Sequence, residues 1–448
     1  MTTIVPFAQQ HPTYSLFEKR WGRCRDAYEG TDSVKRAGVA YLPRLKGQSD
    51  DDYNAYKERA LYVNVVGRTL NSLTGLITSR PPEITVPDEL RTRIDDVDNR
   101  GTQFPQLFRW CVNDTLLVGR LGLLVDFPES GGEGYITAYS AENIVNWSID
   151  NDTYQLNMVM LQEHLYEPTN TPMPGGMQFA LQSVTRIRVL FLDADGSYKQ
   201  HIFMQKSVGV GTAPVSLELQ REIVPLVRDR AINFIPFTFI TPFGIDSNVY
   251  KPPMLDIVDV NLSHYRSSAD LEQGRHFTAL PTPVVTGVET DKELRIGSET
   301  AWVLPDKDAK AMYLEFKGEG LKSLETALKE KMEQMALFST RLMDTSTRGS
   351  ESPDSVKIRH SSDAATLIDI ARAVENGLTR AYGTLRDLEG LEGDVKILLN
   401  KNFLSMKLSA QEMKALTEAY LNGAIDEATY LWNLQKGDVK PPKGEENA

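Results

Sequence analysis

Several features of common protein classes are absent from this sequence of 448 residues. Its two cysteines, Cys24 and Cys111, are too few for a disulfide scaffold and lack the spacing of a structural zinc site. No stretch approaches about 18 uninterrupted apolar residues, so no transmembrane helix is expected. The first residues lack a basic segment followed by a long apolar run, so we expect no signal peptide and a soluble, cytoplasmic protein.

The sequence also lacks an excess of positive charge. It contains 49 Lys and Arg against 61 Asp and Glu, which gives a net charge of −12. A protein that reads a DNA sequence is usually basic, because phosphate contacts supply much of its affinity. This composition therefore disfavours a sequence-specific DNA-binding protein, whereas passive contact with nucleic acid stays open.

Motifs for metal or phosphate binding are missing. The segment 193–196 (Asp-Ala-Asp-Gly) has its glycine at the fourth position, and Met204 stands where a calcium loop needs a bidentate glutamate. A hairpin turn is the better interpretation. Gly209-Val-Gly211 is not followed by the Gly-Lys-Ser/Thr of a phosphate loop, so it is expected to be a flexible loop. No metal site and no cofactor are predicted.

No catalytic residues are predicted either. None of the six histidines forms a pair with the helical spacing of a zinc site, and no Gly-x-Ser-x-Gly motif is present. His164 and His201 lie on strand-like segments, and the sequence leaves open whether they meet. Asp126 ends a buried strand, a common position for a catalytic carboxylate, but an ion-pair or capping role is favoured.

Apolar residues at intervals of three or four predict helices at 15–28, 49–79 and 103–118. The second helix is expected as a single element, beginning at Ser49 and its three following aspartates and ending at Arg80-Pro81. Strands are then expected at 123–127, 135–139, 158–166, 179–192, 198–206, 216–224 and 234–240. This antiparallel or mixed β region, flanked by helices, places the chain in the α+β class.

Two long helices, at 255–279 and 321–344, bracket a short β-like insert at 280–320. The second helix carries an apolar stripe over roughly 33 Å, with lysines and glutamates on its other face. A polar loop at 345–362 follows, then a third long helix from about Ser362. The end of the chain is expected to form a brief strand at 395–400, two short helices after Ser409, and a disordered tail.

The order and spacing of several stretches resemble the portal proteins of tailed double-stranded DNA bacteriophages. These stretches are 41–43, 53–60, 119–128, 252–270, 280–287, 361–366 and 395–400. The resemblance spans about Thr13 to Lys436 and is carried by the order of the stretches, not by a single motif.

The resemblance implies a portal-type α+β fold and a twelve-subunit ring at one capsid vertex. It implies a mixed α/β wing at 1–250, stem helices at 251–279 and 321–344, a clip at 280–320, a tunnel loop at 345–362, a long helix returning to the wing at 363–404, and a helical crown and tail at 405–448. The ring would be the channel for DNA packaging and ejection, in the virion and in the host cytoplasm during assembly.

The resemblance also implies partners. They are further copies of the chain, the terminase large subunit, a head-completion or adaptor protein, the major capsid protein or a scaffold, and double-stranded DNA that passes without sequence specificity; no membrane is involved. The portal is expected to be no enzyme, because ATP hydrolysis would belong to the terminase, in line with the missing phosphate loop.

Two sets of candidate residues follow. Arg348, Lys357 and Arg359 are candidates for transient contact with DNA phosphates in the tunnel, although they could equally be ordinary solvated charges. The candidates for packing between stem helices are Leu321, Leu324, Leu328, Met332 and Met335. Two other functions stay open: another head–tail connector or minor virion protein without a DNA channel, and an enzyme whose site is assembled in the β region.

Overall fold

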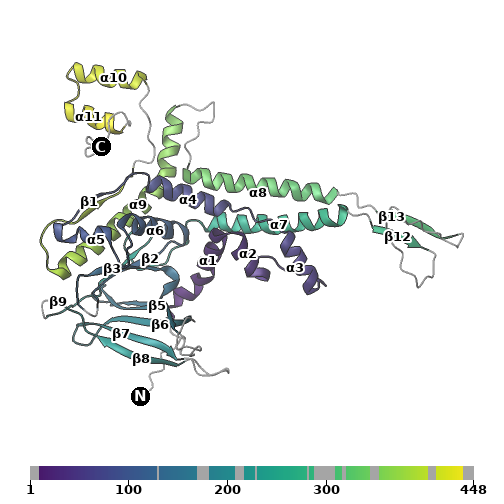
Figure 1. Ribbon diagram of the computed structural model, residues 1–448. Helices are drawn as coiled ribbons and strands as arrows, with labels where there is room; N and C mark the ends of the chain where they lie inside the picture. Colours follow the sequence, from purple (N-terminus) through teal and green to yellow (C-terminus); the bar gives the residue numbers. More distant parts are fainter. Residues whose placement is uncertain are drawn as a thin grey trace, which may run out of the picture. The chain divides into compact units, whose positions relative to one another are not determined.

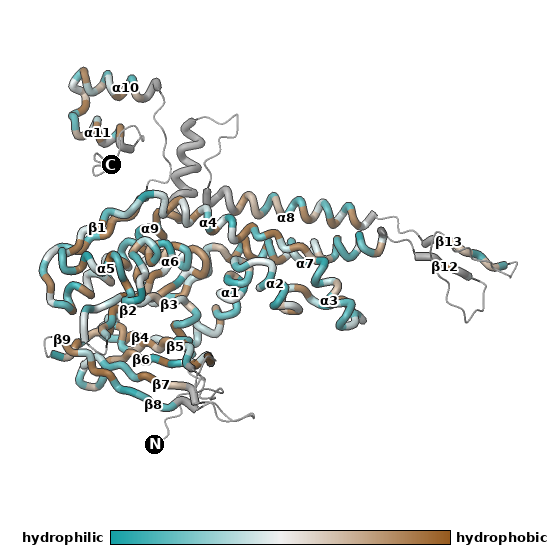
Figure 2. Tube along the Cα trace, viewed as in Figure 1, coloured by the Kyte–Doolittle hydropathy of each residue, from teal (hydrophilic) through white to brown (hydrophobic). Residues whose placement is uncertain are grey.

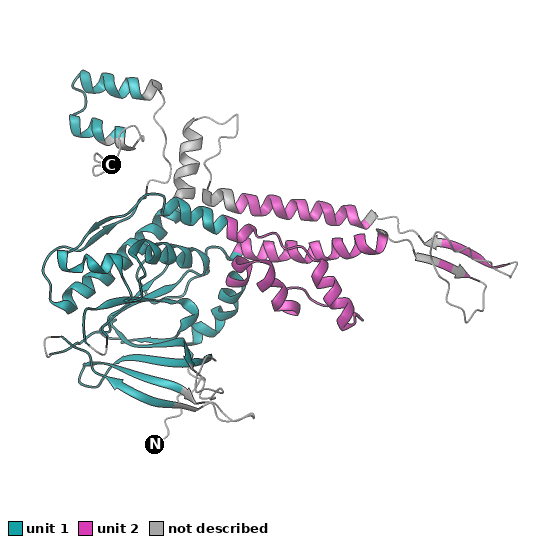
Figure 3. Cartoon of the chain, in the orientation of Figure 1, with its two compact units in different colours: residues 1–24, 69–255, 339–448 teal, residues 25–68, 256–338 magenta. Residues whose placement is uncertain are grey.

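The computed structural model describes residues 10–128, 131–168, 181–206, 216–227, 230–279, 282–286, 308–314, 319–343, 353–401 and 410–436. Helices and strands are both abundant and the sheets are antiparallel, which confirms the α+β class (Figure 1). The chain divides into two compact units (Figure 3). Unit 1 contains residues 1–24, 69–255 and 339–448, and unit 2 contains residues 25–68 and 256–338.

The helices include three of 25 residues or more, α7, α8 and α9. Their bounds are α1 (Pro12–Glu29), α2 (Thr31–Ala37), α3 (Asp50–Arg59), α4 (Val65–Ile77), α5 (Thr92–Asp95), α6 (Phe104–Leu117), α7 (Leu255–Ala279), α8 (Glu319–Met343), α9 (Pro353–Glu389), α10 (Ala410–Leu421) and α11 (Glu427–Lys436). None of the helices in the described ranges combines the length and apolar character that a bilayer-crossing helix needs.

The strands form one five-stranded sheet, one three-stranded sheet and three two-stranded pairs in the described part of the chain. The five-stranded sheet has the order β4 (Ile144–Ile149), β5 (Leu156–Pro168), β6 (Leu181–Leu192), β7 (Tyr198–Lys206) and β8 (Ser216–Ile223). The three-stranded sheet has the order β11 (Phe237–Ile240), β2 (Leu121–Asp126) and β3 (Tyr135–Ser140). The pairs are β1 (Glu83–Thr85) with β14 (Lys396–Leu398), β9 (Leu226–Val227) with β10 (Arg230–Ala231), and β12 (Thr282–Thr286) with β13 (Lys310–Leu314).

The core of unit 1 is built around β2, whose six residues are all buried. Because β2 is the central strand of its sheet and α9 packs on the sheet, the strand is an apolar run without alternation. Gly122 is needed here, since a Cβ at this position would lie 2.1 Å from the Phe237 ring. Gly377 of α9 similarly makes room for the Ile240 side chain.

Most of the predicted elements are confirmed. The two long helices predicted at 255–279 and 321–344 correspond to α7 and α8, and the short strand predicted at 395–400 corresponds to β14. The turn at 193–196 joins β6 to β7, with Gly196 at φ 79°. The strands β1 and β4 were not predicted. Strand β1 has only three residues, whereas the alternating Val145, Trp147 and Ile149 of β4 are a strand signal in the sequence.

The single helix predicted at 49–79 is wrong. The structure has two helices, α3 and α4, separated by residues 60–64. The periodicity of apolar residues continues through the break, so it gives no sign of it. Asn64 ends the interruption, because its side-chain oxygen accepts the amide of Gly67 at 2.7 Å and so caps the start of α4.

The start predicted for the third long helix is also wrong. Helix α9 begins at Pro353, so residues 353–362 are helical and not part of a loop. Proline suits the first turn of a helix, where its missing N–H costs nothing, so Pro353 is a local signal for this start. The rest of the predicted tunnel loop, residues 345–352, lies outside the described residues.

Candidate functional site

The part of the molecule that best matches a specialised role is an arm formed by residues 256–338 of unit 2. It contains α7, the hairpin β12–β13 and α8. Each helix has 25 residues and is therefore about 37 Å long. In Figure 1, α7 and α8 run side by side and the hairpin follows their ends.

Buried Asn261 fixes the base of α7 to the segment before α4. Its amide donates to the Val63 carbonyl at 2.9 Å. Its oxygen accepts from the Tyr62 hydroxyl at 3.2 Å and from the amides of Val65 and Val66 at 3.3 and 3.4 Å. These amides lie in the first turn of α4, where no helical carbonyl is available to them. Asn261 thus caps α4 from another part of the chain.

Three further contacts extend along α7 from the same segment. The Tyr56 hydroxyl donates to Asp270 at 2.6 Å, and Arg59 donates to the Gln273 side chain at 2.8 Å. The Leu61 amide donates to the Ser268 hydroxyl of α7 at 3.2 Å. Burial and the bond to Asp270 raise the pKa of Tyr56, so its hydroxyl remains the donor over the physiological pH range.

Helix α8 is held to α7 by polar contacts at two positions, one near the middle of the helices and one nearer the hairpin. Lys331 of α8 donates to the Ser267 hydroxyl and to the Ser263 carbonyl. Nearer the hairpin, Arg275 of α7 donates to Glu325 of α8 at 2.9 Å. Close packing beside the Arg275–Glu325 contact is allowed by Gly274, since a Cβ there would lie 2.5 Å from the Leu321 side chain.

His264 of α7 is buried beside Lys331. Burial and the Lys331 charge lower the pKa of His264, and the Nδ1 atom has no hydrogen-bond partner in the described part of the chain. The imidazole is therefore neutral near pH 7. Acidification would place a second positive charge beside the ammonium group that joins the two helices.

The five stem-packing candidates differ in how far their side chains are buried. Met335 is completely buried, Met332 is 39% exposed, and the three leucines at 321, 324 and 328 are half-buried. Figure 2 shows hydrophobic and hydrophilic residues alternating along α8. The opposite face exposes Lys329 and Glu333, which form a weak ion pair at 3.9 Å. Within this unit, α7 covers only part of the apolar stripe of α8.

The hairpin between the two helices is a simple antiparallel pair. Thr286 faces Lys310 at one end and Thr282 faces Leu314 at the other. Its exposed residues include Met312, at 52% exposure. Two strands alone are marginally stable in water. This segment corresponds to the predicted clip, of which residues 287–307 lie outside the described residues.

Nothing in the structure tests the three tunnel candidates. Arg348 lies outside the described residues, and Lys357 and Arg359 lie in the first turns of α9, where only the backbone is described. Their role in DNA contact stays a prediction.

The β region of unit 1 contains a buried polar network, which bears on the enzyme alternative. Arg188 of β6 donates to Asp126 at 2.8 Å, to Gln200 at 2.7 Å and to Glu163 at 3.0 Å. Gln200 also donates to the other oxygen of Asp126 at 2.9 Å, and Tyr139 donates to Glu163 at 2.6 Å. The network joins the three-stranded sheet to the five-stranded sheet.

Every carboxylate oxygen of this network accepts a hydrogen bond, since Arg186 binds the second oxygen of Glu163. Burial alone would raise the pKa of Glu163, but Arg188 and Arg186 lower it more, so the carboxylate is charged. A base or metal ligand needs a lone pair that is free for the substrate or the ion. The geometry fits the ion-pair role favoured for Asp126.

The histidines do not form a site with each other. His164 lies on β5 and His201 on β7, with β6 between them. His201 lies 3.5 Å from Glu222 and packs edge-on against Phe191. In the described part of the chain, no three His, Cys, Asp or Glu residues are close enough together to hold a metal ion.

Comparison with known proteins identifies two kinds of similarity. Residues 253–386 match a family described as a domain of unknown function, DUF4055. The match begins just before α7 and ends near the end of α9, so it contains the whole arm. No curated protein matches the chain.

Among solved structures, the chain is similar to components of a gene transfer agent particle. One chain of the virion of the native particle matches with a TM-score of 0.44 and 12% identity, over 90% of this chain and 98% of the other. Chains of the neck of the empty particle, computed with C6 symmetry, and of the native particle, computed with C12 symmetry, match with TM-scores of 0.41 and 12% identity. They cover 92% and 90% of this chain, and 94% and 98% of their own length. Scores of this size do not establish a common fold.

Proposed function

We propose that the chain is a phage-like head–tail structural protein and, more specifically, a portal. In this proposal, copies of the chain form a ring, with twelve as the expected number, at one vertex of a capsid. DNA passes through the ring during packaging and ejection. The terminase and head-completion proteins dock on it, and Arg348, Lys357 and Arg359 contact the passing phosphates.

The arm carries this proposal. Two helices of about 37 Å that bracket a two-stranded hairpin have the order of stem, clip and stem that the sequence resemblance implies. The apolar stripe of α8 is only partly covered by α7. In a ring, the remaining apolar surface would pack against the next copy. Head-to-tail interfaces of this kind form a closed ring when the rotation between copies closes.

The proposal includes no enzymatic activity. Both oxygens of Asp126 and of Glu163 already accept hydrogen bonds from arginine, tyrosine or glutamine donors. The buried Arg188 network joins two sheets, and this structural role is more in line with a channel protein than with a catalyst. The acidic net charge of −12 also suits a channel, because DNA that must slide should not bind tightly.

The first experiment is native mass spectrometry and negative-stain microscopy of the full chain and of two α8 variants. The wild type is expected to form a ring with a central hole. Met332→Glu places a charge on the partly covered stripe and is expected to give folded monomers, because this side chain is 39% exposed within one copy. Glu330→Gln, on the exposed face of the same helix, is the control and should assemble as the wild type does.

Two outcomes would contradict the proposal. A wild-type chain that stays monomeric at high concentration and with its scaffold would rule out a ring. A ring that forms equally well with Met332→Glu would show that α8 is not at the interface between copies. A closed ring without a central hole would favour a different connector component.

A further inference from the structure

The β4 edge of the five-stranded sheet is already used by another part of the chain. In the described residues β4 pairs with β5 on one side, and its other side is an outer edge of the sheet. At this edge the His11 amide donates to the Val145 carbonyl at 3.0 Å. Two residues further along β4, the Trp147 amide donates to the side chain of its neighbour Asn146 at 2.9 Å. This edge therefore has a backbone partner at Val145. In the described part of the chain, residues 147–149 have no backbone partner on this side.

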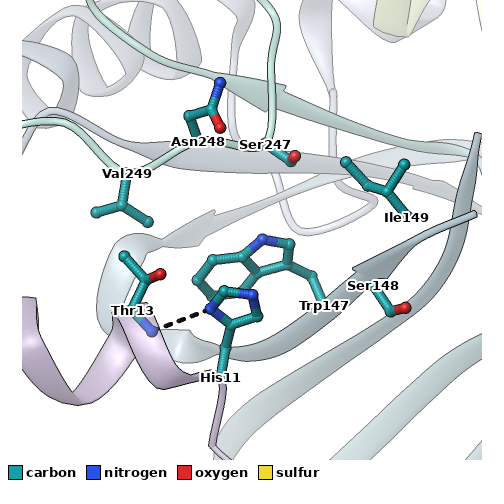
Figure 4. A pocket seen from close by; sticks show the side chains of 8 residues that line it. All are labelled: His11, Thr13, Trp147, Ser148, Ile149, Ser247, Asn248 and Val249. Carbon is teal, nitrogen blue, oxygen red and sulfur yellow. Dashed lines mark hydrogen bonds between the residues drawn. The ribbon is translucent and has the colours of Figure 1, made fainter. Parts of the chain in front are cut away.

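A pocket of about 450 Å³ lies along this edge (Figure 4). One wall is Trp147, Ser148 and Ile149 of β4, and the facing wall is the segment 247–249. His11 and Thr13 complete the lining. In the part of the chain that the structure describes, neither the amide nor the carbonyl of Val249 has a hydrogen-bond partner. Both walls thus offer backbone groups to whatever enters between them.

A buried positive charge lies behind the pocket. The Arg120 side chain is completely buried, and its guanidinium lies 3.7 Å from the centre of the Trp147 ring. The His11 ring stacks on the same indole at 3.8 Å. Two groups at these distances cannot share one face of the ring, so Trp147 lies between the imidazole and the guanidinium.

The charge of Arg120 is incompletely neutralised. Its Nη2 atom donates to the Ser247 carbonyl at 3.1 Å, whereas Nε and Nη1 have no partner among the described residues. The Asp246 carboxylate partly offsets this charge, and it also accepts from the Asn248 amide at 2.9 Å and the Thr241 hydroxyl at 3.1 Å. Burial lowers the pKa of Arg120 to about 9, so the side chain is still charged at pH 7.

The polar side chains that line the pocket carry no formal charge and can donate hydrogen bonds. None of its eight described lining residues is acidic, and burial and the Arg120 charge lower the pKa of His11, which keeps that ring neutral. The His11 Nδ1 atom accepts from the Thr13 amide at 3.2 Å, so the proton of the neutral ring is on Nε2. Hydroxyls of Ser148 and Ser247 add further donors. The pocket therefore suits a group with negative charge.

We propose that this pocket binds an extended peptide of a partner protein, which adds as a strand to the β4 edge and places an acidic side chain in the pocket. Backbone groups of the β4 wall and of Val249 would bind the main chain of the peptide. The donors and the positive potential of Arg120 would select a carboxylate. The site lies within unit 1, apart from the arm, and does not depend on the portal proposal.

The probe is a fluorescein-labelled peptide of nine residues in which Thr and Glu alternate, measured by anisotropy with the full chain. Saturable binding is expected, about tenfold tighter than that of the matching Thr/Lys peptide. A third peptide carries the Thr/Glu sequence with alternate amides N-methylated. It keeps the carboxylates and cannot form a ladder of hydrogen bonds, so it is expected to lose binding at least tenfold.

Variants of the protein locate the site. Asn248→Glu and Ile149→Glu add a charge to side chains that are exposed at the rim, so the fold should be kept. Each is expected to weaken binding of the acidic peptide about tenfold. Leu226→Glu, at a residue that is 58% exposed on β9 and does not line the pocket, is the matched control and should bind as the wild type does.

Each other outcome overturns the proposal. Equal binding of the N-methylated peptide would mean that the pocket takes a carboxylate without strand addition. Equal binding of the Thr/Lys peptide would show that Arg120 does not select a carboxylate. A loss in Leu226→Glu as large as in the rim variants would indicate non-specific charge repulsion, and absence of saturable binding up to millimolar peptide would exclude the site.

Discussion

Asn261→Ala is the substitution that most directly tests how the arm is fixed at its base. The Asn261 side chain is completely buried and contacts Tyr62, Val63, Val65 and Val66. Alanine removes these contacts and fits a helix well, so the propensity of α7 does not fall. Any loss of stability must therefore come from the broken polar contacts and from the small space that is left.

The expected loss of unfolding free energy depends on which groups keep another hydrogen-bond partner when Asn261 is replaced. The Tyr62 hydroxyl still donates to the Ala27 carbonyl at 2.8 Å, and Val65 and Val63 keep the bond between them at 2.8 Å. Val66, in the first turn of α4, is left with a buried amide and no partner. A buried orphan amide costs about 1–3 kcal/mol, and the lost bond to Val63 adds about 1 kcal/mol. We expect a loss of about 2–4 kcal/mol.

Urea unfolding gives the free energy, and hydrogen exchange gives its location. Residues 61–66 and the first turns of α4 should exchange faster, while exchange in β2 should change little. Ser263→Ala on the same helix is the control, because the arm uses the carbonyl of Ser263 and not its hydroxyl. A loss below about 0.5 kcal/mol, the range of neutral surface substitutions, with unchanged exchange at 61–66, would refute this account of the arm.

Three other predictions concern packing and charge. Because Arg188 and its neighbouring arginine hold the pKa of Glu163 below its ordinary value of 4.5 despite burial, its stabilising effect is present above pH 4.5 and is lost as the pH falls further. Glu163→Gln should cost about 3 kcal/mol at pH 7 and flatten the acid side of a stability–pH curve. Gly274→Val should cost about 1–3 kcal/mol and increase exchange in α8, because its Cβ would meet Leu321. Gly383→Ala, in open space on α9, should raise the unfolding free energy by about 0.5–1 kcal/mol in urea.

Local patterns predicted the arm well, because its helices are long and its turns are marked by proline and glycine. The β6–β7 hairpin was predictable for the same reason, since the Asp193–Gly196 turn is a local signal. The break at 60–64 was not predictable. Its backbone groups bond to Asn261 and Ser268, which lie 198 and 207 residues later, so nothing near the break in sequence indicates it.

The buried network shows the same limit. A carboxylate at the end of β2 could be noticed in the sequence, and an ion pair was the favoured role for Asp126. Its partner Arg188 lies 62 residues away, on a strand of another sheet. An arginine in the middle of an apolar strand is the one signal that could have pointed to it, since such a residue is rarely buried without a carboxylate. The pairing itself depends on how the two sheets stack.

The two arm helices differ in how much of their surface the unit already uses. The first half of α7 is largely buried, because residues 62–66 and α8 both contact it, whereas α8 contacts α7 on one side only. If copies of the chain associate through their arms, α8 must therefore supply most of the new contact. Lys331 and Arg275 join α8 to α7, so they fix the position of the α8 surface relative to α7. A ring should then respond more to substitutions at the partly covered stripe of α8, and at these two joints, than to any change on the base of α7.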